Sequence, residues 1–328
     1  MPELPEVQTT VNGLKKHIVG LVIRDVWSNY DSPYYKGSET IKDPVFFEYF
    51  KSAIIGKKIL SVERRAKNIL INISGGKTIL VHMKMTGHLL YGKYKYVGDN
   101  KLKSMTREST TTTSPANTTS DAVSASDPWE PISPPSLKDP YNRRVRFVIT
   151  FNNGRQLALS DTRRFAKVTV VETKTIHESE HLIGVGPEPL DEAFNFDAFC
   201  TRIDLRQSGK IKLVLMDQNI IAGIGNIYAD ESLWRAGVHP LRTVKSLGTA
   251  ERRKIFDAIK STLSHGIDFG GDSMSDYRNV LGEEGKFQEQ HMAYQRTGEK
   301  CRKNGCKGTI IRIVVGGRGT HLCDIHQE

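Results

Sequence analysis

The N-terminal residues of this 328-residue chain could do chemistry. Pro2 follows Met1, and a proline at this position permits removal of the methionine, which would leave a secondary amine at the terminus. An α-amino group titrates near pH ~8, so a fraction of it is unprotonated and nucleophilic at neutral pH. Glu3 places a carboxylic acid beside that amine, where it could donate or accept a proton. Because chain termini are usually frayed and idle, this segment alone does not establish a catalytic site.

The C-terminal tail carries a metal-ligand pattern. Cys301 and Cys306 form one pair, and Cys323 and His326 form a second pair after sixteen intervening residues. Two ligand pairs around a short hairpin are typical of a structural zinc site, so we expect one structural zinc ion. His321 is a rival for the fourth ligand because it lies two residues from Cys323. A tail this small has no core of its own, so the metal would supply its folding free energy.

The elements that must position these residues can be read from hydrophobic periodicity. Val7, Val11, Leu14 and Ile18 recur at helical spacing and predict a helix that anchors the N-terminus against a core. Strand patterns follow at 68–73, 78–85, 145–151 and 156–159, and they favour a β-sandwich. Helical patterns cover 196–206, 208–218, 226–236 and 248–265, with Gly237 as the end of the third helix. A short hairpin is expected around 316–317 in the tail.

A glycine-containing turn separates two of these helices. It spans residues 217–228, and Asn226 lies where a helix N-cap would be. Free amides at such a helix start suit a phosphate, and a helix–two-turn–helix unit would present them to a DNA backbone. Taken alone, the turn is equally compatible with a helix-hairpin that only packs.

Composition limits the class of partner. Lys and Arg outnumber Asp and Glu by 47 to 37, the net charge is +10, and basic residues cluster at 64–67, 163–167 and 300–318. This distribution favours a polyanion such as nucleic acid. No apolar run is long enough to span a bilayer and no secretory signal opens the chain, so we expect a soluble intracellular protein.

Residues 104–126 are dominated by Ser and Thr and predict a flexible insertion.

Seven motifs occur together in one order along the chain. They are PELPEV at 2–7, RRAKNIL at 64–70, HMKMTG at 82–87, DTRRF at 161–165, GPEPL at 186–190, AGIGNIYADESLWRAGVHP at 222–240 and GGRGTHLC at 316–323. With them the chain closely resembles the bacterial formamidopyrimidine-DNA glycosylases, the Fpg or MutM branch of the Fpg/Nei family. The resemblance covers nearly the whole chain apart from an insertion near 93–143.

The resemblance implies an α+β multidomain fold. It comprises an N-terminal catalytic β-sandwich with an anchoring helix at 2–175, including a disordered Ser/Thr-rich insertion at about 93–143. A helical helix–two-turn–helix DNA-binding domain follows at 176–290, with a lesion-capping loop at about 268–290. The C-terminal zinc-finger β-hairpin occupies 291–328.

The implied activity is that of a bifunctional DNA glycosylase and AP lyase. It would excise oxidised purines, chiefly 8-oxoguanine and formamidopyrimidines, from duplex DNA and cleave the strand by β,δ-elimination. The residues that match the family's catalytic positions are Pro2 as nucleophile, Glu3 as acid and base, Glu6 near the lesion, and Lys67 beside a phosphate. The positions that match its DNA contacts are His82, Met85, Arg163, Phe165, Lys212, Asn226 and Arg318. Met85, Arg163 and Phe165 would fill the void that an extruded nucleotide leaves in the duplex.

The expected partner is double-stranded DNA with oxidised bases or abasic sites, bound by a monomer in the cytoplasm at the nucleoid, without a membrane. Three other hypotheses stay open: an endonuclease VIII-like enzyme for oxidised pyrimidines, a non-catalytic damaged-DNA binder, and a zinc-ribbon transcription or RNA-binding protein. The chain departs from the family pattern at His326, where a cysteine is usual, in the wider first ligand pair, at Thr162 and at Gln295.

Overall fold

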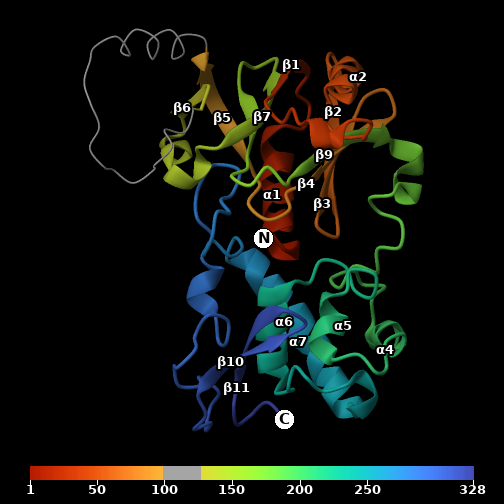
Figure 1. Cartoon of the computed structure of the whole chain (residues 1–328), viewed down its shortest axis with the longest axis vertical. Helices are drawn as coiled ribbons and strands as arrows, with labels where there is room; N and C mark the ends of the chain where they lie inside the picture. Colours follow the sequence, from red (N-terminus) through yellow and green to blue (C-terminus); the bar gives the residue numbers. More distant parts are fainter. Residues whose placement is uncertain (99–126) are drawn as a thin grey trace.

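Figure 1 shows the chain as a computed structural model that describes residues 1–98 and 127–328. Most strands lie in one half of the molecule, and α4 to α7 lie in the other half with the β10–β11 hairpin. The N-terminus lies at the junction of the two halves, close to α1 and α6. Within the described residues, no helix is long and apolar enough to cross a membrane.

Two antiparallel sheets form the strand-rich half. One sheet has the strand order β1 (Ile23–Ser28), β7 (Val145–Phe151), β8 (Gln156–Ser160), β5 (His88–Tyr96) and β6 (Trp129–Ser133). The other has the order β2 (Ile59–Arg65), β3 (Asn68–Ile73), β4 (Lys77–His82) and β9 (Lys167–Glu172). The strands at 68–73 and 145–151 match the prediction, whereas β4 ends at His82 rather than at Met85 because a turn follows it.

The sheets share one core, as expected for a sandwich. Side chains alternate between the two faces of a strand, so every second residue can point inward. Ile69 and Ile71 of β3 are buried in the same cluster as Phe147 and Ile149 of β7. The predicted sandwich is therefore confirmed.

The helix α1 (Leu4–His17) joins the two halves. Val7, Val11 and Leu14 are buried in the sandwich core, as their helical spacing predicts. Leu4, one turn earlier, is buried instead in the core of the helical half. The beginning of the chain is therefore held from both sides.

The helical half contains α4 (Phe196–Asp204), α5 (Ile211–Met216), α6 (Asn226–Ala236) and α7 (Thr249–Asp268) around a second core. Gly237 ends α6 in the left-handed conformation with φ 73°, as predicted. α5 is shorter than the predicted 208–218 because Lys210 forms a β-bridge with Thr243.

A short hairpin forms the C-terminal unit. It consists of β10 (Ile310–Val315) and β11 (Arg318–Cys323), and its small core includes Trp234 of α6.

The first half of the chain also contains a helix that was not predicted from the sequence, α2 (Pro44–Ile54). The short 3-10 helices are η1 (Pro33–Tyr35), η2 (Pro135–Lys138), η3 (Pro140–Asn142), η4 (Thr173–Glu178), η5 (Val244–Ser246) and η6 (Phe287–Gln290).

The predicted disordered insertion at 93–143 needs a correction at both ends. β5 continues to Tyr96, and residues 127–143 form β6, η2 and η3. Leu137 is buried with Tyr94, and Trp129 packs against the same cluster, so this Pro-rich stretch has apolar surface to bury. The Ser/Thr-rich part predicted to be flexible, 104–126, lies outside the described residues.

Candidate active site and metal centre

Backbone and side-chain bonds fix the N-terminal segment in place. The Leu4 amide donates to the Gly223 carbonyl (3.0 Å), and the Glu3 amide donates to Oε2 of Glu6 (2.7 Å). Pro2 is buried, whereas Met1 is exposed. This terminus is therefore held by the helical half and is not a frayed end, which is the condition that a catalytic terminus must meet.

The Glu3 carboxylate lies at the first turn of α6. Its oxygens accept from the amides of Ile227 (3.1 Å) and Tyr228 (3.4 Å), two of the unpaired donors that every helix start presents. A Cβ on Gly225 would lie 2.3 Å from the Glu3 Cδ, so only glycine leaves room for this carboxylate. Burial raises the pKa of Glu3, although Lys67 and the two amides oppose that effect.

Two sequence-based expectations about this helix start are wrong. Asn226 is not the N-cap: Gly225 is, and the Asn226 side chain donates to the Gly319 carbonyl of the β10–β11 hairpin (3.0 Å). The amides that we expected to bind a phosphate bind Glu3 instead. A carboxylate from the same chain therefore fills the predicted anion site.

Lys67 faces the same buried space from the turn between β2 and β3. Ala66 adopts a left-handed conformation with φ 54°, and this turn directs Lys67 inward. The Lys67 Nζ donates to the Ile224 carbonyl (3.0 Å), next to the glycine turn that holds Glu3. Burial lowers the pKa of Lys67, and the Glu3 and Glu6 carboxylates partly offset this.

Glu6 lies where three segments meet. Its Oε1 accepts from the Tyr228 hydroxyl of α6 (2.7 Å) and from the Asp272 amide (2.8 Å), which follows α7. Burial, followed by repulsion from Glu3, raises the pKa of Glu6 to about 7. The Tyr228 ring stacks on Phe287 with centroids 4.9 Å apart. Tyr228 lies inside the 222–240 motif, but its residue type alone does not indicate this role.

The segment after α7, proposed from sequence as a capping loop, contacts both halves. Val280 is buried in the sandwich core and Phe287 in the helical core. Asp272 lies at the start of the segment, and its carboxylate is 2.8 Å from Nε2 of the buried His291. Gly271 has φ 86°, which glycine adopts without cost.

Met85, Arg163 and Phe165 come together on two adjacent loops. The Arg163 guanidinium lies 4.5 Å from the centre of the Phe165 ring and 3.1 Å from the Met85 sulfur. Met85 and Phe165 are exposed, at 42% and 45% of their surface, so these loops present two apolar side chains beside a guanidinium.

The buried Asp161 ties these two loops together. Its two carboxylate oxygens accept from the Thr86 hydroxyl (2.5 Å) and the Ala166 amide (2.8 Å). The Tyr30 hydroxyl also donates to it (2.7 Å). This positioning role of Asp161 cannot be predicted from the sequence, because residues far apart in the chain supply its partners.

The remaining residues expected to contact DNA differ in accessibility. Arg318 is exposed at the start of β11, and His82 is partly exposed at the end of β4. Lys212, by contrast, is fully buried, with its Nζ 2.7 Å from Asp230 Oδ1 and 2.5 Å from the Thr320 hydroxyl. The Lys212 ammonium therefore holds the hairpin against α6 in this structure and does not face an open surface.

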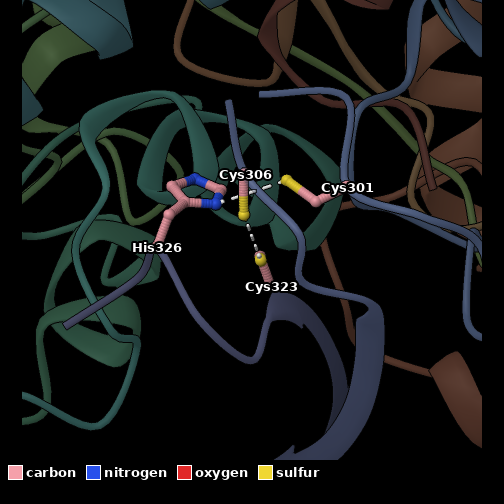
Figure 2. A group of neighbouring side chains, drawn as sticks. All are labelled: Cys301, Cys306, Cys323 and His326. Atoms are coloured by element: carbon pink, nitrogen blue, oxygen red, sulfur yellow. Dashed lines mark hydrogen bonds between the residues drawn. The ribbon is translucent and has the colours of Figure 1, made fainter. Parts of the chain in front are cut away.

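The four predicted metal ligands form a cluster, drawn in Figure 2. Their ligand atoms all lie within 4.8 Å of one another, and this is the group among the described residues that could hold a metal ion. Cys301 Sγ is 3.3 Å from His326 Nδ1, and Cys306 Sγ is 3.6 Å from Cys323 Sγ. A metal bound tetrahedrally about 2.3 Å from each sulfur implies sulfur separations of about 3.8 Å, close to the observed spacing.

The surroundings of the cluster also suit a cation. The Nε2 of His326 is 2.9 Å from the Trp234 carbonyl, which leaves Nδ1 free to bind a metal. Each cysteine sulfur accepts a hydrogen bond from a backbone amide. The donors are Lys303 for Cys301, Gly308 for Cys306 and Ile325 for Cys323. Burial raises the pKa of the Cys323 thiol to about 11, and a bound cation would supply the charge that ionises it.

The rival ligand His321 lies elsewhere. Its amide donates to Oδ2 of Asp230 (2.8 Å) and its ring stacks edge-on against Tyr294. His326 is therefore the histidine of the metal-binding cluster.

Glu6 should make the stability of the protein depend on pH. Its pKa of about 7 lies above the ordinary value of 4.5, so the folded state holds the proton more tightly. The resulting stabilisation is complete below the unfolded pKa and is lost as pH rises through about 7, by up to about 3 kcal/mol. Urea unfolding of Glu6→Gln should therefore show a smaller loss of stability between pH 5 and pH 8 than the parent.

The control for this measurement is Glu192→Gln, at an exposed position. Its unfolding free energy should follow that of the parent at every pH. Parallel pH dependence of Glu6→Gln and the parent would contradict the role given to Glu6.

Known proteins resemble the chain along its whole length. Family models match residues 1–168, as the formamidopyrimidine-DNA glycosylase N-terminal domain, and residues 185–278, as the formamidopyrimidine-DNA glycosylase H2TH domain. The formamidopyrimidine-DNA glycosylase of Herpetosiphon aurantiacus is 34% identical over 100% of both chains. That of Heliobacterium modesticaldum is 32% identical over 98% of both.

Solved structures give the same result. The MutM (Fpg) protein of Thermus thermophilus matches with a TM-score of 0.72 and 31% identity, covering 99% of this chain and 98% of that one. The Lactococcus lactis Fpg bound to DNA with an abasic site matches with a TM-score of 0.76 and 28% identity over 99% of both chains. With matched domains, full-length relatives and a shared fold, this chain belongs to the formamidopyrimidine-DNA glycosylase family of DNA-repair enzymes.

Proposed function

We propose that this enzyme is a bifunctional DNA glycosylase and AP lyase that removes oxidised purines from duplex DNA. The observation that carries the proposal is the anchored N-terminus, where Pro2 and Glu3 lie between the two halves of the molecule with Lys67 beside them. The substrate class is supported by a relative, since a Lactococcus lactis Fpg mutant was solved with DNA containing Fapy-dG. The DNA would be bound by a monomer, in the cytoplasm at the nucleoid.

Removal of Met1 would expose the Pro2 nitrogen as a secondary amine. This amine would attack C1′ of the damaged nucleotide as the bond from C1′ to the base breaks, and the product is an iminium between Pro2 and the sugar. Glu3 would deliver and recover protons at the sugar, and its raised pKa favours the protonated form that such an acid needs. Loss of the C2′ proton with the 3′ phosphate, and then of the 5′ phosphate, would cleave the strand.

Lys67 and Glu6 would each assist this reaction without forming a bond to the sugar. Lys67 would bind the phosphate beside the lesion, and Glu6 would link the N-terminus to the loop after α7 through the Asp272 amide. Closing that loop over the extruded base would exclude water from the reaction.

The exposed Met85, Arg163 and Phe165 would enter the duplex when the damaged nucleotide leaves the stack. The flat ring and the flexible thioether can wedge between bases, and the guanidinium can donate to the orphaned base. His82, Asn226 and Arg318 would contact backbone phosphates, which carry no sequence information. Lys212 would act on this surface indirectly, by holding the hairpin that carries Arg318.

We further propose that Cys301, Cys306, Cys323 and His326 hold one structural zinc ion, which supplies rigidity and no chemistry to the reaction. The domains would then be 2–175 for the sandwich with its insertion, 176–290 for the helix–two-turn–helix unit with its capping loop at about 268–290, and 291–328 for the zinc finger.

Covalent trapping tests the nucleophile. With borohydride and a duplex carrying 8-oxoguanine opposite cytosine, protein shown by mass to lack Met1 should form an adduct at Pro2. Pro2→Gly should lose most strand cleavage, whereas Pro5→Ala, at the other proline of the motif, should keep it. Full activity of Pro2→Gly would overturn the assignment.

The substrate class is tested in the same assay. An adduct only with an oxidised-pyrimidine duplex would indicate an endonuclease VIII-like enzyme. Protein that lacks Met1 and forms no adduct with any duplex, abasic DNA included, would be a non-catalytic binder.

Gly225→Ala tests the position of Glu3. The φ of Gly225 is −130°, which alanine can adopt, so the change acts through the contact between its Cβ and the Glu3 carboxylate. We expect excision to fall by about 100-fold, the scale of one acid–base group, with the protein still folded. Gly248→Ala is the matched control, because Gly248 is the N-cap of α7 and a Cβ there would meet only Glu251 Oε2, at an ordinary contact distance of 3.7 Å. Normal excision by Gly225→Ala would show that the position of Glu3 does not matter.

Metal analysis tests the zinc site. Freshly purified protein should contain one zinc ion per chain, and Cys306→Ser should lose it. Cys200→Ser should retain zinc, since Cys200 lies in α4 outside the cluster. Chelation should weaken duplex binding, because the hairpin that presents Arg318 would lose its support. Zinc-free parent protein with normal DNA affinity would contradict this assignment.

A further inference from the structure

A pocket of about 300 Å³ opens beside His82 on the outer side of the four-stranded sheet. We call it the lateral pocket, and it is lined by Asn68, Leu80, His82, Lys84, Lys167, Glu180 and His181. Lys84 and Lys167 are not among the residues that we expected to contact DNA. The pocket therefore holds two cationic side chains, Lys84 and Lys167, that have no part in the proposed function so far.

Strand register explains why polar side chains gather here. Asn68 pairs with His82 across β3 and β4, and His82 pairs with Lys167 across β4 and β9. Directly opposite residues in an antiparallel sheet point to the same face, so these three side chains form one row. His181 lies over this row, with its Nδ1 3.1 Å from the Lys167 Nζ.

Lys84 lies at the rim of the lateral pocket in a constrained conformation. Its φ of 56° is in the left-handed region, which lysine adopts rarely and at a cost. The Lys84 amide donates to Nδ1 of His82 (3.0 Å). The imidazole is neutral, since burial and nearby Lys84 lower the pKa of His82 to about 3. Its proton is therefore on Nε2, which is available to donate to an anion.

The positive charges around the lateral pocket are incompletely balanced. Burial, then repulsion from Lys167, lowers the pKa of Lys84. Burial is the main cause of a lowered pKa of Lys42. Asp161 opposes this effect, and Lys84 and Lys167 add to it. Two carboxylates partly offset these charges: Glu180 lies 2.7 Å from the Lys167 Nζ, and Glu39 and Glu180 both act on His181.

The lateral pocket adjoins the surface on which the duplex would lie. Lys84 is next to Met85 in the chain, and Lys42 donates to the carbonyl of Arg164 (2.8 Å), next to Arg163 and Phe165. A duplex wedged open by Met85 and Phe165 would place its backbone within reach of this pocket.

We propose that Lys84 and Lys167 hold, in the lateral pocket, the same backbone phosphate of the DNA to which the His82 Nε2–H donates. This inference rests on the proposed function and adds two cationic ligands, Lys84 and Lys167, to the phosphate contact of His82. Glu180 occupies the place of the phosphate in the free protein. Its side chain is 72% exposed, and a surface ion pair of this kind is weak, so its displacement costs little.

Salt dependence of duplex binding tests the proposal with undamaged DNA and with abasic-site DNA. Lys84→Ala and Lys167→Ala should each weaken binding about three- to tenfold at ~0.15 M salt and reduce the slope of log K against log salt by about one. Glu180→Gln should tighten binding two- to fivefold, and this gain should disappear in Glu180→Gln/Lys167→Ala. These surface changes should leave the melting temperature unaltered.

Lys77→Ala is the matched control, because Lys77 lies at the other end of β4 and also pairs with a glutamate, Glu172. It should change neither affinity nor slope. Arg318→Ala should reduce the slope if the proposed function is correct. Unchanged slopes for Lys84→Ala and Lys167→Ala, beside a reduced slope for Arg318→Ala, would overturn the lateral pocket alone. A parent protein that does not bind duplex DNA would overturn the proposed function with it.

Discussion

The structure depends on one constraint, the burial of the Glu3 carboxylate against the first amides of α6. A carboxylate is costly to remove from water unless donors replace its hydration. Ile227 and Tyr228 supply those donors, and their orientation requires the glycine turn that precedes them. Since Glu3 is the N-cap of α1, the same contact fixes the chain terminus between two cores. The sandwich and the helical half are thus placed relative to each other by a residue of the candidate site.

This arrangement keeps three ionisable groups away from water. Lys67 lies near Glu3 and Glu6, and burial raises the pKa of both acids while it lowers that of the amine. Burial therefore favours the neutral form of each group, whereas attraction between Lys67 and Glu3 favours their charged forms and repulsion from Glu3 disfavours ionisation of Glu6. Shifts of this kind, produced by burial and by specific charged partners, are typical of groups at acid–base sites.

Sequence alone predicted the elements with a strong local pattern. The spacing of Val7, Val11 and Leu14 placed α1, and the spacing of the cysteines and His326 identified the metal-binding cluster, because both signals are encoded within a few turns of chain. The carboxylate at the start of α6 could not be predicted in this way. Residue types show that the amides there need an anion, but not that Glu3, more than 220 residues earlier, supplies it.

Contacts between residues far apart in the chain explain the other differences between the predictions from sequence and the structure. Lys212 matched a family position for DNA contact, and only the fold shows that Asp230 and Thr320 surround it. Trp129 and Leu137 lie within the insertion predicted to be disordered, yet both pack in the apolar cluster on one face of the five-stranded sheet. The assigned roles of Pro2, Glu3, Lys67 and the DNA-contact residues remain predictions from the motifs.

The helix α6 lies between the Glu3 carboxylate and the metal-binding cluster. Glu3 lies at its N-terminus, and His326 approaches the Trp234 carbonyl in its last turn. Aligned peptide units give a helix a macrodipole with its positive end at the N-terminus and its negative end at the C-terminus. The carboxylate therefore meets the positive pole, and the imidazole N–H that a metal would polarise meets the negative one. An eleven-residue helix thus presents its positive end to the Glu3 carboxylate and its negative end to the metal-binding cluster.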